Sequence, residues 1–344
     1  MLRGAIIGLG NVALEGHLPG WMRRRDVEIV AATDLEPARR AAIETRIPQA
    51  QWYATAEGLL ARERLDFVDI CTPPASHGPL VATALRAGCH VLCEKPLVIS
   101  PEELAPLTRF AGDHGRVLHT VHNWHHAPIV KRAAELLAQG AIGEVRRVTW
   151  QTLRTKPAAV RDGHGANWRL DPALSGGGVL TDHGWHVFYV IRRWVSALPT
   201  AISARLETRR HTTWAVEDTA TVHLTFPHAT AEILLTWAAD TRDNRAEVIG
   251  TDGSLDLQDD TLVLIRQGRQ ERWPCPPAMS NGSAHPDWFD PVVDQFLGEV
   301  TGSTRPDGNL AEAALCTLLE SMARESSRRG GSAIHLPATT TPAW

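Results

Sequence analysis

Asp182 and His186 are a pair of residues whose types and spacing could do acid–base chemistry. They lie four residues apart, just after the glycine run at 176–178, and this spacing puts both side chains on one face of a helix. A histidine whose pKa is set by a nearby acid can move a proton near neutral pH. The pair alone also fits an ordinary buried histidine satisfied by a helix neighbour, so other residues must decide between the two interpretations.

Lys95 is a third candidate because of where its strand ends. A short apolar strand is expected over residues 90–93 and leads directly into Glu94-Lys95-Pro96. In a parallel, doubly wound sheet the ligand crevice lies outside the carboxyl ends of the strands. If this strand belongs to such a sheet, Lys95 is a site residue.

Strands and helices alternate along the first part of the chain, as such a sheet requires. Ser76 is expected to cap the helix that follows it, and Gly88 to end that helix. The alternation predicts a mostly parallel, doubly wound α/β sheet in a first domain of residues 1–121. Strands are expected over 4–7, 27–33, 67–71 and 90–93, and helices over 36–45, 57–64 and 78–87.

A glycine-rich turn follows the first strand. It has the pattern G-x-G-x-x-A and contains Gly8, Gly10, Asn11 and Val12. The glycines permit a tight turn and the close approach of a pyrophosphate, which would lie at a helix N-terminus. The turn therefore predicts a dinucleotide site.

Asp34 ends the second expected strand, where an acid can bind the ribose hydroxyls of adenosine. Leu35 follows, so no basic residue stands directly beside the acid to receive a 2'-phosphate. NAD is therefore favoured over NADP. Arg39 and Arg40 lie within a turn or two and leave NADP open.

The pattern changes at His122, where a second domain of residues 122–344 is expected to begin. Its alternating strands build a sheet, and Thr251-Asp252-Gly253 predicts a hairpin. Strands are expected over 200–207, 218–225, 231–237, 245–250 and 254–257, and helices over 129–139, 290–300 and 310–326.

Composition and charge restrict the class of function. The chain has 344 residues and a formal net charge of -4, which gives no field for gathering nucleic acid or an anionic membrane. The N-terminus lacks the apolar stretch of a secretory signal, and nothing resembles a membrane-spanning segment. Five cysteines without a C-x-x-C pair suit reduced thiols and no zinc site. We expect a cytoplasmic protein that acts on small molecules.

Motifs in a fixed order carry a resemblance to a known family. They run through GLGNVA at 8–13, Asp34, TPPASH at 72–77, Glu94-Lys95-Pro96, GAIGEVRRV at 140–148, WRLDPALSGGG at 168–178, DHGWH at 182–186 and IGTDGSLDL at 249–257. In this order and over most of its length, the chain resembles the glucose-fructose oxidoreductase and inositol dehydrogenase family, Gfo/Idh/MocA.

The resemblance implies an N-terminal Rossmann domain and a C-terminal α+β domain with a large, open, mainly antiparallel sheet. That sheet often joins subunits, so a homodimer or homotetramer is expected. It also implies a nicotinamide cofactor that helps to oxidise or reduce a carbon of a sugar, cyclitol or related polyol. Thr72, Pro73, His77, Glu94 and Lys95 would then lie at the cofactor, although His77 could simply form a helix-start hydrogen bond.

The same resemblance assigns catalytic roles. His186 would be the general acid/base and Lys95 would hydrogen-bond the reacting oxygen, aimed by a Lys95-Pro96 peptide that is often cis. Asp182 would orient the histidine or hold a neighbouring hydroxyl of the substrate. These types suit hydride transfer, because the imidazole can take the hydroxyl proton while an ammonium stabilises charge on the oxygen.

Substrate contacts are expected from the second domain, where indole faces suit the C–H faces of sugar rings. Many relatives carry an arginine and an aromatic before Pro128, and here both positions are histidines, which puts an anionic substrate group at that place in doubt. Four histidines could in principle bind zinc, but no close carboxylate completes a recognised pattern, so no metal is predicted. The expected substrate residues are Asn123, Trp124, Trp168 and His183, and the four histidines are His122, His125, His126 and His183.

Three functions remain open at this point. The leading hypothesis is an NAD(P)-dependent oxidoreductase acting on a secondary hydroxyl or ketone. The second is a redox-neutral glycosidase, lyase or epimerase that uses transient oxidation, which would give product without a net change in NADH absorbance. The third is a nucleotide-binding sensor without chemistry, which the joint presence of Lys95, Asp182 and His186 disfavours.

Overall fold

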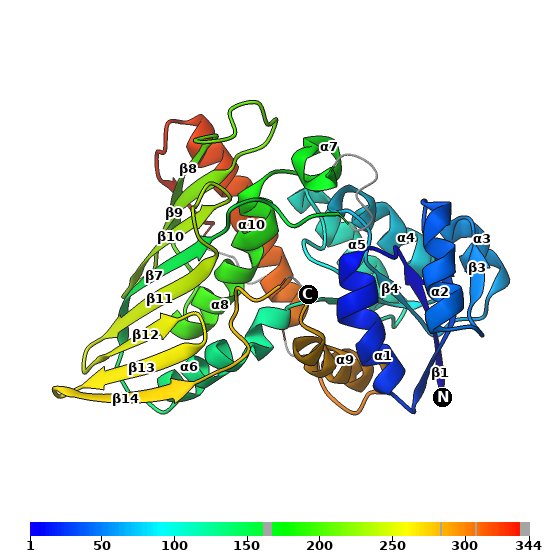
Figure 1. Cartoon of the computed structure of the whole chain (residues 1–344), viewed down its shortest axis with the longest axis horizontal. Coiled ribbons are helices and arrows are strands. Elements are labelled where there is room, and N and C mark those ends of the chain that lie inside the picture. The colour runs from blue at the N-terminus through cyan, green and yellow to red at the C-terminus, as the bar shows by residue number, and fades with distance from the viewer. Residues whose placement is uncertain (161–166, 283, 307, 338–344) are drawn as a thin grey trace.

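A computed structural model gives the fold of residues 1–160, 167–282, 284–306 and 308–337, so the end of the predicted second domain, 338–344, lies outside the described residues. The chain forms two sheets, with strand orders β3-β2-β1-β4-β5-β6 and β14-β13-β12-β11-β7-β10-β9-β8-β15. Figure 1 shows the two sheets at opposite ends of the long axis, with helices between them.

The six strands of the first sheet are all parallel. Strand order reverses direction between β1 and β4, which is the switch point where doubly wound sheets bind ligands. The sheet is buried on both faces, so its strands are apolar runs, as expected. The strands are β1 (Leu2–Ile7), β2 (Val27–Thr33), β3 (Gln51–Tyr53), β4 (Phe67–Ile70), β5 (His90–Cys93) and β6 (Leu118–Thr120).

Helices cover both faces of this sheet. Neighbouring residues of one strand point to opposite faces, so Val68 packs in one core and Phe67 in another. The predicted cap at Ser76 is wrong: its hydroxyl donates to the Thr72 hydroxyl at 2.7 Å or the Pro73 carbonyl at 2.8 Å, and it makes no cap bond. The helices are the π-helix η1 (Val12–His17), α1 (Leu18–Arg23), η2 (Pro37–Arg39), α2 (Arg40–Arg46), α3 (Ala56–Arg62), η3 (Pro74–Ser76), α4 (His77–Arg86) and α5 (Pro101–Asp113).

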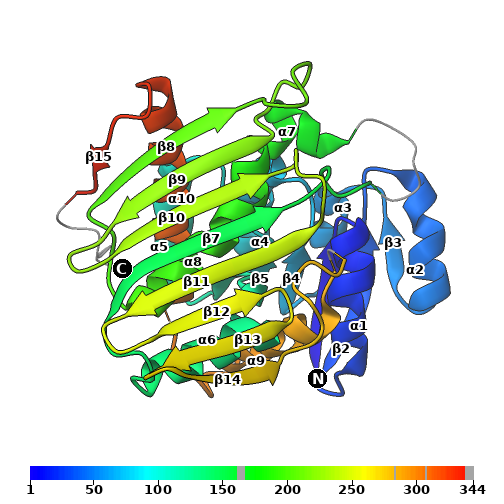
Figure 2. The ribbon, with the colours of Figure 1, turned by 60° about the vertical axis from the view of Figure 1, so that its left-hand side comes forward.

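The second sheet is mainly antiparallel, and β7 with β10 forms its parallel pair. Sequence reasoning missed β7, β13, β14 and β15. Figure 2 shows the face of this sheet that no helix covers. The strands are β7 (Val145–Leu153), β8 (Ala201–Glu207), β9 (Thr219–Thr225), β10 (Thr230–Thr236), β11 (Asp243–Gly250), β12 (Ser254–Gln258), β13 (Thr261–Arg266), β14 (Arg269–Pro274) and β15 (Ile334–His335).

The other face of the second sheet packs against helices from the second part of the chain, and one of them, α10 (Asn309–Arg328), also contacts β6 of the first sheet. α9 (Pro286–Val300) contributes Phe289 and Phe296 to the core around Trp21 and Phe67. A helix from late in the chain therefore stabilises the first sheet. The remaining helices are η4 (Asn123–His126), α6 (Pro128–Ala138), η5 (Trp168–Leu170), α7 (Pro172–Ser175), the π-helix η6 (Leu180–Gly184) and α8 (Trp185–Val195).

Two further observations concern the whole described chain. All five cysteines are buried free thiols. Within the described ranges, every helix is too short or too polar to cross a lipid bilayer.

Candidate active site

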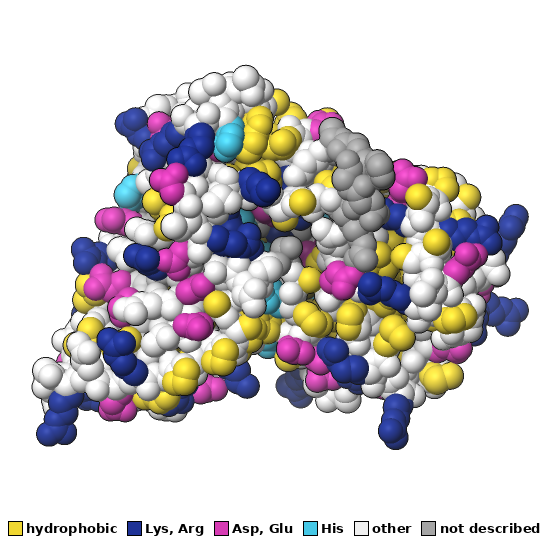
Figure 3. All heavy atoms as spheres, in the orientation of Figure 1, with side chains coloured by type: hydrophobic (Ala, Val, Ile, Leu, Met, Phe, Trp, Pro, Cys, Tyr) yellow, Lys and Arg dark blue, Asp and Glu magenta, His cyan; other side chains and the backbone are white. Residues whose placement is uncertain are grey.

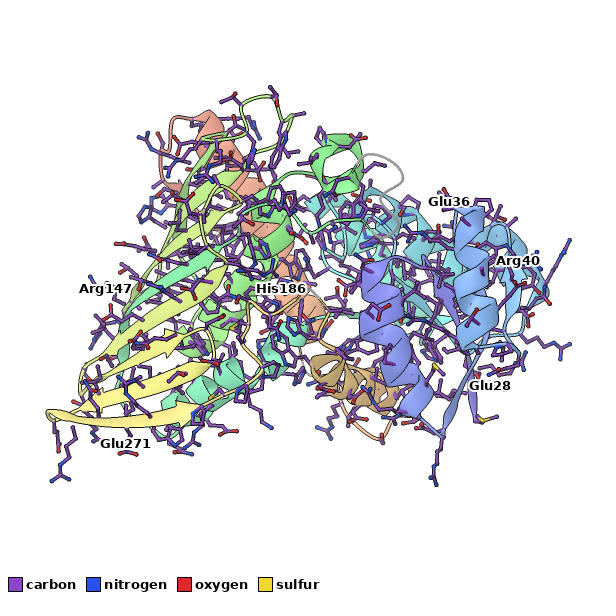
Figure 4. The ribbon with its side chains drawn as sticks, viewed as in Figure 1. Glu28, Glu36, Arg40, Arg147, His186 and Glu271 are labelled. Atoms are coloured by element: carbon purple, nitrogen blue, oxygen red, sulfur yellow. The ribbon has the colours of Figure 1, made fainter. Side chains whose placement is uncertain are left out.

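A cleft of about 730 Å³ lies between the two sheets, at the carboxyl ends of β1, β4 and β5. Figure 3 shows a notch between the two parts of the molecule, with histidine side chains at its base. In Figure 4 His186 lies between the two sheets, while Arg147 and Glu271 point away from the cleft. The cleft size falls within the range of ordinary ligand sites.

The glycine-rich turn forms one end of the cleft. Gly8 has a φ of +92°, and a Cβ there would lie 2.8 Å from the Thr72 side chain and 2.9 Å from the Cys71 backbone. Both the conformation and the close approach therefore require glycine. Gly10, Asn11 and Val12 also line the cleft.

Asp34 lines the same end and is held by the backbone. Its carboxylate accepts hydrogen bonds from the Leu9 N–H at 2.6 Å and the Glu36 N–H at 2.8 Å. Arg39 Nη1 lies 3.8 Å from Asp34 Oδ2. Asn11 Nδ2 donates to the Ala159 carbonyl at 2.9 Å, which ties the second part of the chain to the turn.

Four of the five residues expected at the cofactor line the cleft: Thr72, Pro73, Glu94 and Lys95. The fifth, His77, does not line it. The His77 ring is fully buried, with Nδ1 at 2.7 Å from the Pro96 carbonyl and Nε2 at 2.8 Å from the Thr72 carbonyl. Burial lowers its pKa. The prediction that His77 binds the cofactor therefore needs correction. Its side chain connects the loops that follow β4 and β5, which form one wall of the cleft.

A buried ion-pair network supports Glu94 from behind. His17 Nε2 lies 3.1 Å from Glu94 Oε1, and His17 Nδ1 lies 3.0 Å from Asp69 Oδ2. Glu94 also accepts the Lys95 N–H at 2.9 Å, and Trp21 donates to Asp69 at 2.7 Å. Burial acts to lower the pKa of His17, but Asp69 and the neighbouring thiol raise it well above its usual value. Sequence reasoning missed this network, although a carboxylate inside the apolar strand β4 could have signalled it.

Lys95 and Asp182 meet at the centre of the cleft. The Lys95–Pro96 peptide is cis, and Lys95 Nζ donates to the Asp182 carbonyl at 2.7 Å while lying 3.6 Å from its carboxylate. Arg169 Nε and His183 Nε2 each lie 3.5 Å from the same carboxylate. Burial acts to raise the pKa of Asp182, but its electrostatic interactions with His183, Arg169 and Lys95 hold that pKa far below its usual range.

His186 is held by Tyr189. Its Nδ1 lies 2.8 Å from the Tyr189 hydroxyl, which also accepts the Trp124 N–H at 3.0 Å. The imidazole stacks on Trp124 at a centroid distance of 4.4 Å and an angle of 7°. Burial, with Lys95 and His183 nearby, lowers the pKa of His186 well below its usual value.

This geometry changes the expected role of Asp182. Among the described residues, the hydrogen-bond partner of the His186 ring is Tyr189 and not Asp182. The π-helix η6 passes into α8 between the two residues, so their spacing brings both to the cleft without direct contact. Sequence reasoning missed Tyr189, which is one helical turn beyond His186.

The four expected substrate residues all line the cleft: Asn123, Trp124, Trp168 and His183. Trp124 is 6% exposed, and its main contact is the stacking of its indole on the His186 ring. Trp168 stacks with the Arg169 guanidinium at 4.2 Å. Asn123 Oδ1 and His183 Nδ1 are buried atoms without a hydrogen-bond partner within the part of the chain that the structure describes. Both can therefore receive a ligand group.

A carboxylate joins two of the four notable histidines behind this wall. Glu312 Oε2 lies 2.9 Å from His125 Nε2 and 3.4 Å from His122 Nδ1. Sequence reasoning found no close carboxylate, and that interpretation was wrong. Both rings pack against Tyr189 at centroid distances of 4.4 and 4.5 Å, so the cluster supports the residue that holds His186.

Among the residues that the structure describes, two groups of side chains have donor atoms spaced closely enough to hold a metal ion: His17 with Asp69 and Cys71, and His122 with His125 and Glu312. In both groups the donor atoms already pair with one another through hydrogen bonds or short ionic contacts.

Comparisons with known proteins agree with this arrangement. Residues 2–122 match a family described as "Oxidoreductase family, NAD-binding Rossmann fold", and residues 130–256 match "GFO/IDH/MocA C-terminal domain". The chain is 32% identical over 190 residues to D-glucoside 3-dehydrogenase of Escherichia coli K12, covering 54% of this chain and 52% of that protein. It is 32% identical over 206 residues to D-xylose 1-dehydrogenase (NADP(+)) 2 of Haloferax volcanii, covering 59% and 60%.

The chain thus spans a little over half the length of these curated relatives. A solved inositol dehydrogenase homolog from Azotobacter vinelandii, complexed with NAD+, superposes with a TM-score of 0.79 at 20% identity and covers 97% of each chain. At this identity the likeness concerns the fold.

Proposed function

The chain belongs to the Gfo/Idh/MocA oxidoreductase family, and we propose that it transfers a hydride between a nicotinamide and a secondary hydroxyl or ketone of a sugar, cyclitol or related polyol. One observation carries the proposal. Lys95, Asp182 and His186 line the same cleft as the glycine-rich turn, although Lys95 follows a strand of the first sheet and the other two lie on η6 and α8. A proton acceptor, a cation and a dinucleotide site are the parts that this reaction needs.

The residues present fit a dinucleotide. A Cβ on Gly8 would clash with the Thr72 side chain and the Cys71 backbone, so the turn keeps the tight glycine geometry that a dinucleotide site requires. Gly10, Asn11 and Val12 would hold the phosphates, Asp34 the adenosine ribose, and Thr72, Pro73 and Glu94 the nicotinamide half. A bound nicotinamide would supply the hydride acceptor or donor.

NAD is the proposed cofactor because Asp34 stands at the ribose position. Its negative charge would repel a 2'-phosphate, and its two backbone hydrogen bonds hold it there. Arg39 is the nearby cation, and its Nη1 already forms an ion pair with Asp34 Oδ2 at 3.8 Å.

His186 Nε2 is the proposed proton acceptor during oxidation. Its depressed pKa keeps the imidazole neutral, so a lone pair is available. Nε2 has that lone pair only when the ring hydrogen is on Nδ1, which then donates to the Tyr189 oxygen at 2.8 Å. When the ring takes a proton, the same hydrogen bond becomes charge-assisted and stabilises the imidazolium. In reduction the same groups act in reverse.

Lys95 is the proposed partner of the reacting oxygen. The Asp182 carbonyl holds its ammonium at 2.7 Å, and the Asp182 carboxylate lies at 3.6 Å. Because the pKa of Asp182 is so low, this carboxylate stays charged and keeps the ammonium in place. Asp182 is thus proposed to position Lys95, while Tyr189 positions His186.

We also propose how the rest of the chain serves the site. Residues 1–121 would bind the cofactor, and residues 122–344 would bind the substrate and join subunits into a homodimer or homotetramer. The uncovered face of the nine-stranded sheet supports this assembly, and light scattering after gel filtration tests it. The free thiols support a cytoplasmic location, which cell fractionation tests.

The direct test of the function is a panel of sugars and polyols with NAD or NADP, followed at the NADH absorbance band. We expect NADH formation with at least one member, and calorimetric binding of NAD tighter than that of NADP. Product without a net absorbance change would identify the redox-neutral class instead. Binding of neither nucleotide would contradict the dinucleotide site itself.

A further inference from the structure

The two ends of the cleft differ in charge. The acids Asp34, Glu36, Glu57 and Glu94 line the cofactor end, where Arg39 is the opposing cation. At the other end, the described lining residues include one acid, Asp182. Five cations line the same end: Lys95, Arg154, Lys156, Arg169 and Arg242. Lys95 and Arg169 both lie close to the single Asp182 carboxylate.

Arg154 is a buried cation without a carboxylate partner. It is 3% exposed and follows the last residue of β7. Its Nη1 donates to the carbonyls of Leu153 at 2.8 Å and Asp243 at 2.9 Å, and its Nη2 donates to the side-chain oxygen of Asn244 at 3.1 Å. No carboxylate of the described residues lies within ion-pair distance, and Nε has no partner there. A buried charge without a counter-charge is costly.

Arg242 lies beside Arg154 and is also without a carboxylate partner among the residues the structure describes. Its Nε donates to the Ser280 carbonyl and its Nη2 to the Gly282 carbonyl, which leaves Nη1 available. The nearest other carboxylates are engaged elsewhere: Asp243 pairs with an arginine at 2.6 Å, and Asp259 accepts from the Ser280 N–H at 2.9 Å.

Two histidines respond to this positive charge. Burial first, and then Arg154 with other cations, lowers the pKa of His183 to about 3. Burial with Arg242 and Arg154 lowers the pKa of His285 to about 4. Both rings line the cleft. The excess of cations therefore faces the reaction end of the cleft, where His183 adjoins Asp182.

We propose that Arg242 and Arg154 form an anion subsite for a carboxylate or phosphate on the substrate, so that the preferred substrate is an acidic sugar or polyol. The proposal rests on the function proposed above and names its substrate class. A guanidinium offers a planar pair of N–H donors that matches either anion. The charge would also draw such substrates into the cleft.

A matched set of substrates separates the possible anions: a neutral hexose, the corresponding uronate and the corresponding 6-phosphate. With NAD and the wild-type protein, we expect kcat/KM to be highest for one of the two anions. In Arg242→Gln, the kcat/KM for that anion divided by the kcat/KM for the hexose should fall about ten- to a hundred-fold, because a hydrogen bond between charged groups is lost. Arg242→Lys should restore part of the ratio.

Arg147→Gln is the matched control, because Arg147 lies on β7 with a 50% exposed side chain, points away from the cleft and is not among its lining residues. Its ratio should equal that of the wild type. The cations could instead bind the phosphates of the cofactor. The Kd for NAD of Arg242→Gln, measured by calorimetry, tests this alternative. A weakened Kd for NAD with an unchanged substrate ratio would assign the cations to the cofactor phosphates and overturn the proposal.

Calorimetric titration of the NAD-loaded protein with uronate, 6-phosphate and hexose needs no turnover, so it separates this proposal from the proposed function. Tighter binding of an anion, lost in Arg242→Gln, supports the subsite even if no substrate is oxidised. Equal affinity for all three ligands overturns the subsite and leaves the oxidoreductase function standing.

Discussion

The cofactor end and the substrate end of the cleft differ in the atoms that form their surfaces. At the cofactor end the backbone of the glycine-rich turn forms the surface, and Asp34 is fixed by two backbone N–H groups. At the substrate end the surface consists of side chains from η6, from α8 and from the segments that follow β7 and precede β11, and these carry a surplus of positive charge.

The charges at the two ends also differ in how they are compensated. His17 lies between Asp69 and Glu94, so these two buried carboxylates near the cofactor end share a cation. At the substrate end Arg154 has no carboxylate partner among the described residues, and His183 Nδ1 has no hydrogen-bond partner. Compensated charges stabilise a shape, whereas uncompensated charges are available to a ligand.

Removing the His186 imidazole should have the largest effect and should affect the substrate end alone. His186→Ala is expected to lower kcat about 10²- to 10⁴-fold, the usual contribution of a general acid/base. The Kd for NAD should stay within about two-fold, because His186 is not part of the proposed cofactor surface. Both are measured by NADH absorbance and calorimetry. Unimpaired turnover on the best substrate would exclude His186 as the acid/base.

Breaking the compensated network should instead affect the stability of the whole molecule. His17→Gln leaves two buried carboxylates without their cation, which is expected to lower the free energy of unfolding by about 3–5 kcal/mol. Urea unfolding measures it, with Arg25→Gln on the exposed loop after α1 as the control. A change as small as that of the control would contradict the role of the network.

The same network predicts a pH dependence. Because the pKa of His17 is raised by folding, its stabilisation is fully present below the usual histidine value and is lost as pH rises through the raised value. The wild type should therefore lose more stability than His17→Gln between about pH 6 and pH 9. Parallel curves for the two proteins would argue against a protonated His17.

These two ends were not equally predictable from the sequence. The cofactor end follows from local patterns, because G-x-G-x-x-A and a strand ending in Asp34 specify it within one βαβ unit. The mostly parallel first sheet and much of the second were predicted for the same reason. His77 was misassigned because its motif says which loop it lies in but not that its ring is buried.

The substrate end depends on pairings between distant strands. Arg154 meets the carbonyl of Asp243 because β7 pairs with β11 in a register that sets Leu153 opposite Asp243. Glu312 reaches His125 from α10, 187 residues further along the chain. Periodicity carries no information on such contacts, so Arg154 and Arg242 could not be found from sequence patterns alone. Tyr189, three residues after His186 on α8, was within reach of helical spacing.

A change at Asp34 should sharpen the contrast by affecting the cofactor end alone. Asp34→Ser is expected to raise the Kd for NAD about ten- to a hundred-fold, since it removes a charge-assisted hydrogen-bond acceptor. It also frees Arg39, 3.8 Å away, to receive a 2'-phosphate, so NADP should gain relative to NAD. Calorimetry with both nucleotides measures this ratio, and an unchanged ratio would exclude Asp34 as the discriminating residue.

Tyr189→Phe should have the smallest effect. The Tyr189 oxygen accepts hydrogen bonds from His186 and from the Trp124 N–H, and losing the one to the imidazole is expected to lower kcat/KM about two- to ten-fold. Because the Tyr189 oxygen stabilises the protonated His186 ring, the pKa of His186 should fall, and the corresponding limb of the kcat/KM profile should move to lower pH. Tyr53→Phe, on the far sheet edge at β3, is the matched control. A uniform rate loss without movement of that limb would indicate a packing role only.

Hydride transfer at the junction of the two ends is the central claim, and isotope transfer tests it directly. The protein is incubated with NAD and with polyols, uronates and sugar phosphates that carry deuterium on their ring carbons, and the nucleotide is analysed by mass spectrometry. We predict deuterium in the NADH formed by the wild type, and His186→Ala should form far less of this labelled NADH in the same time. Conversion of a labelled substrate to an oxidised product while the NADH stays unlabelled would contradict the account.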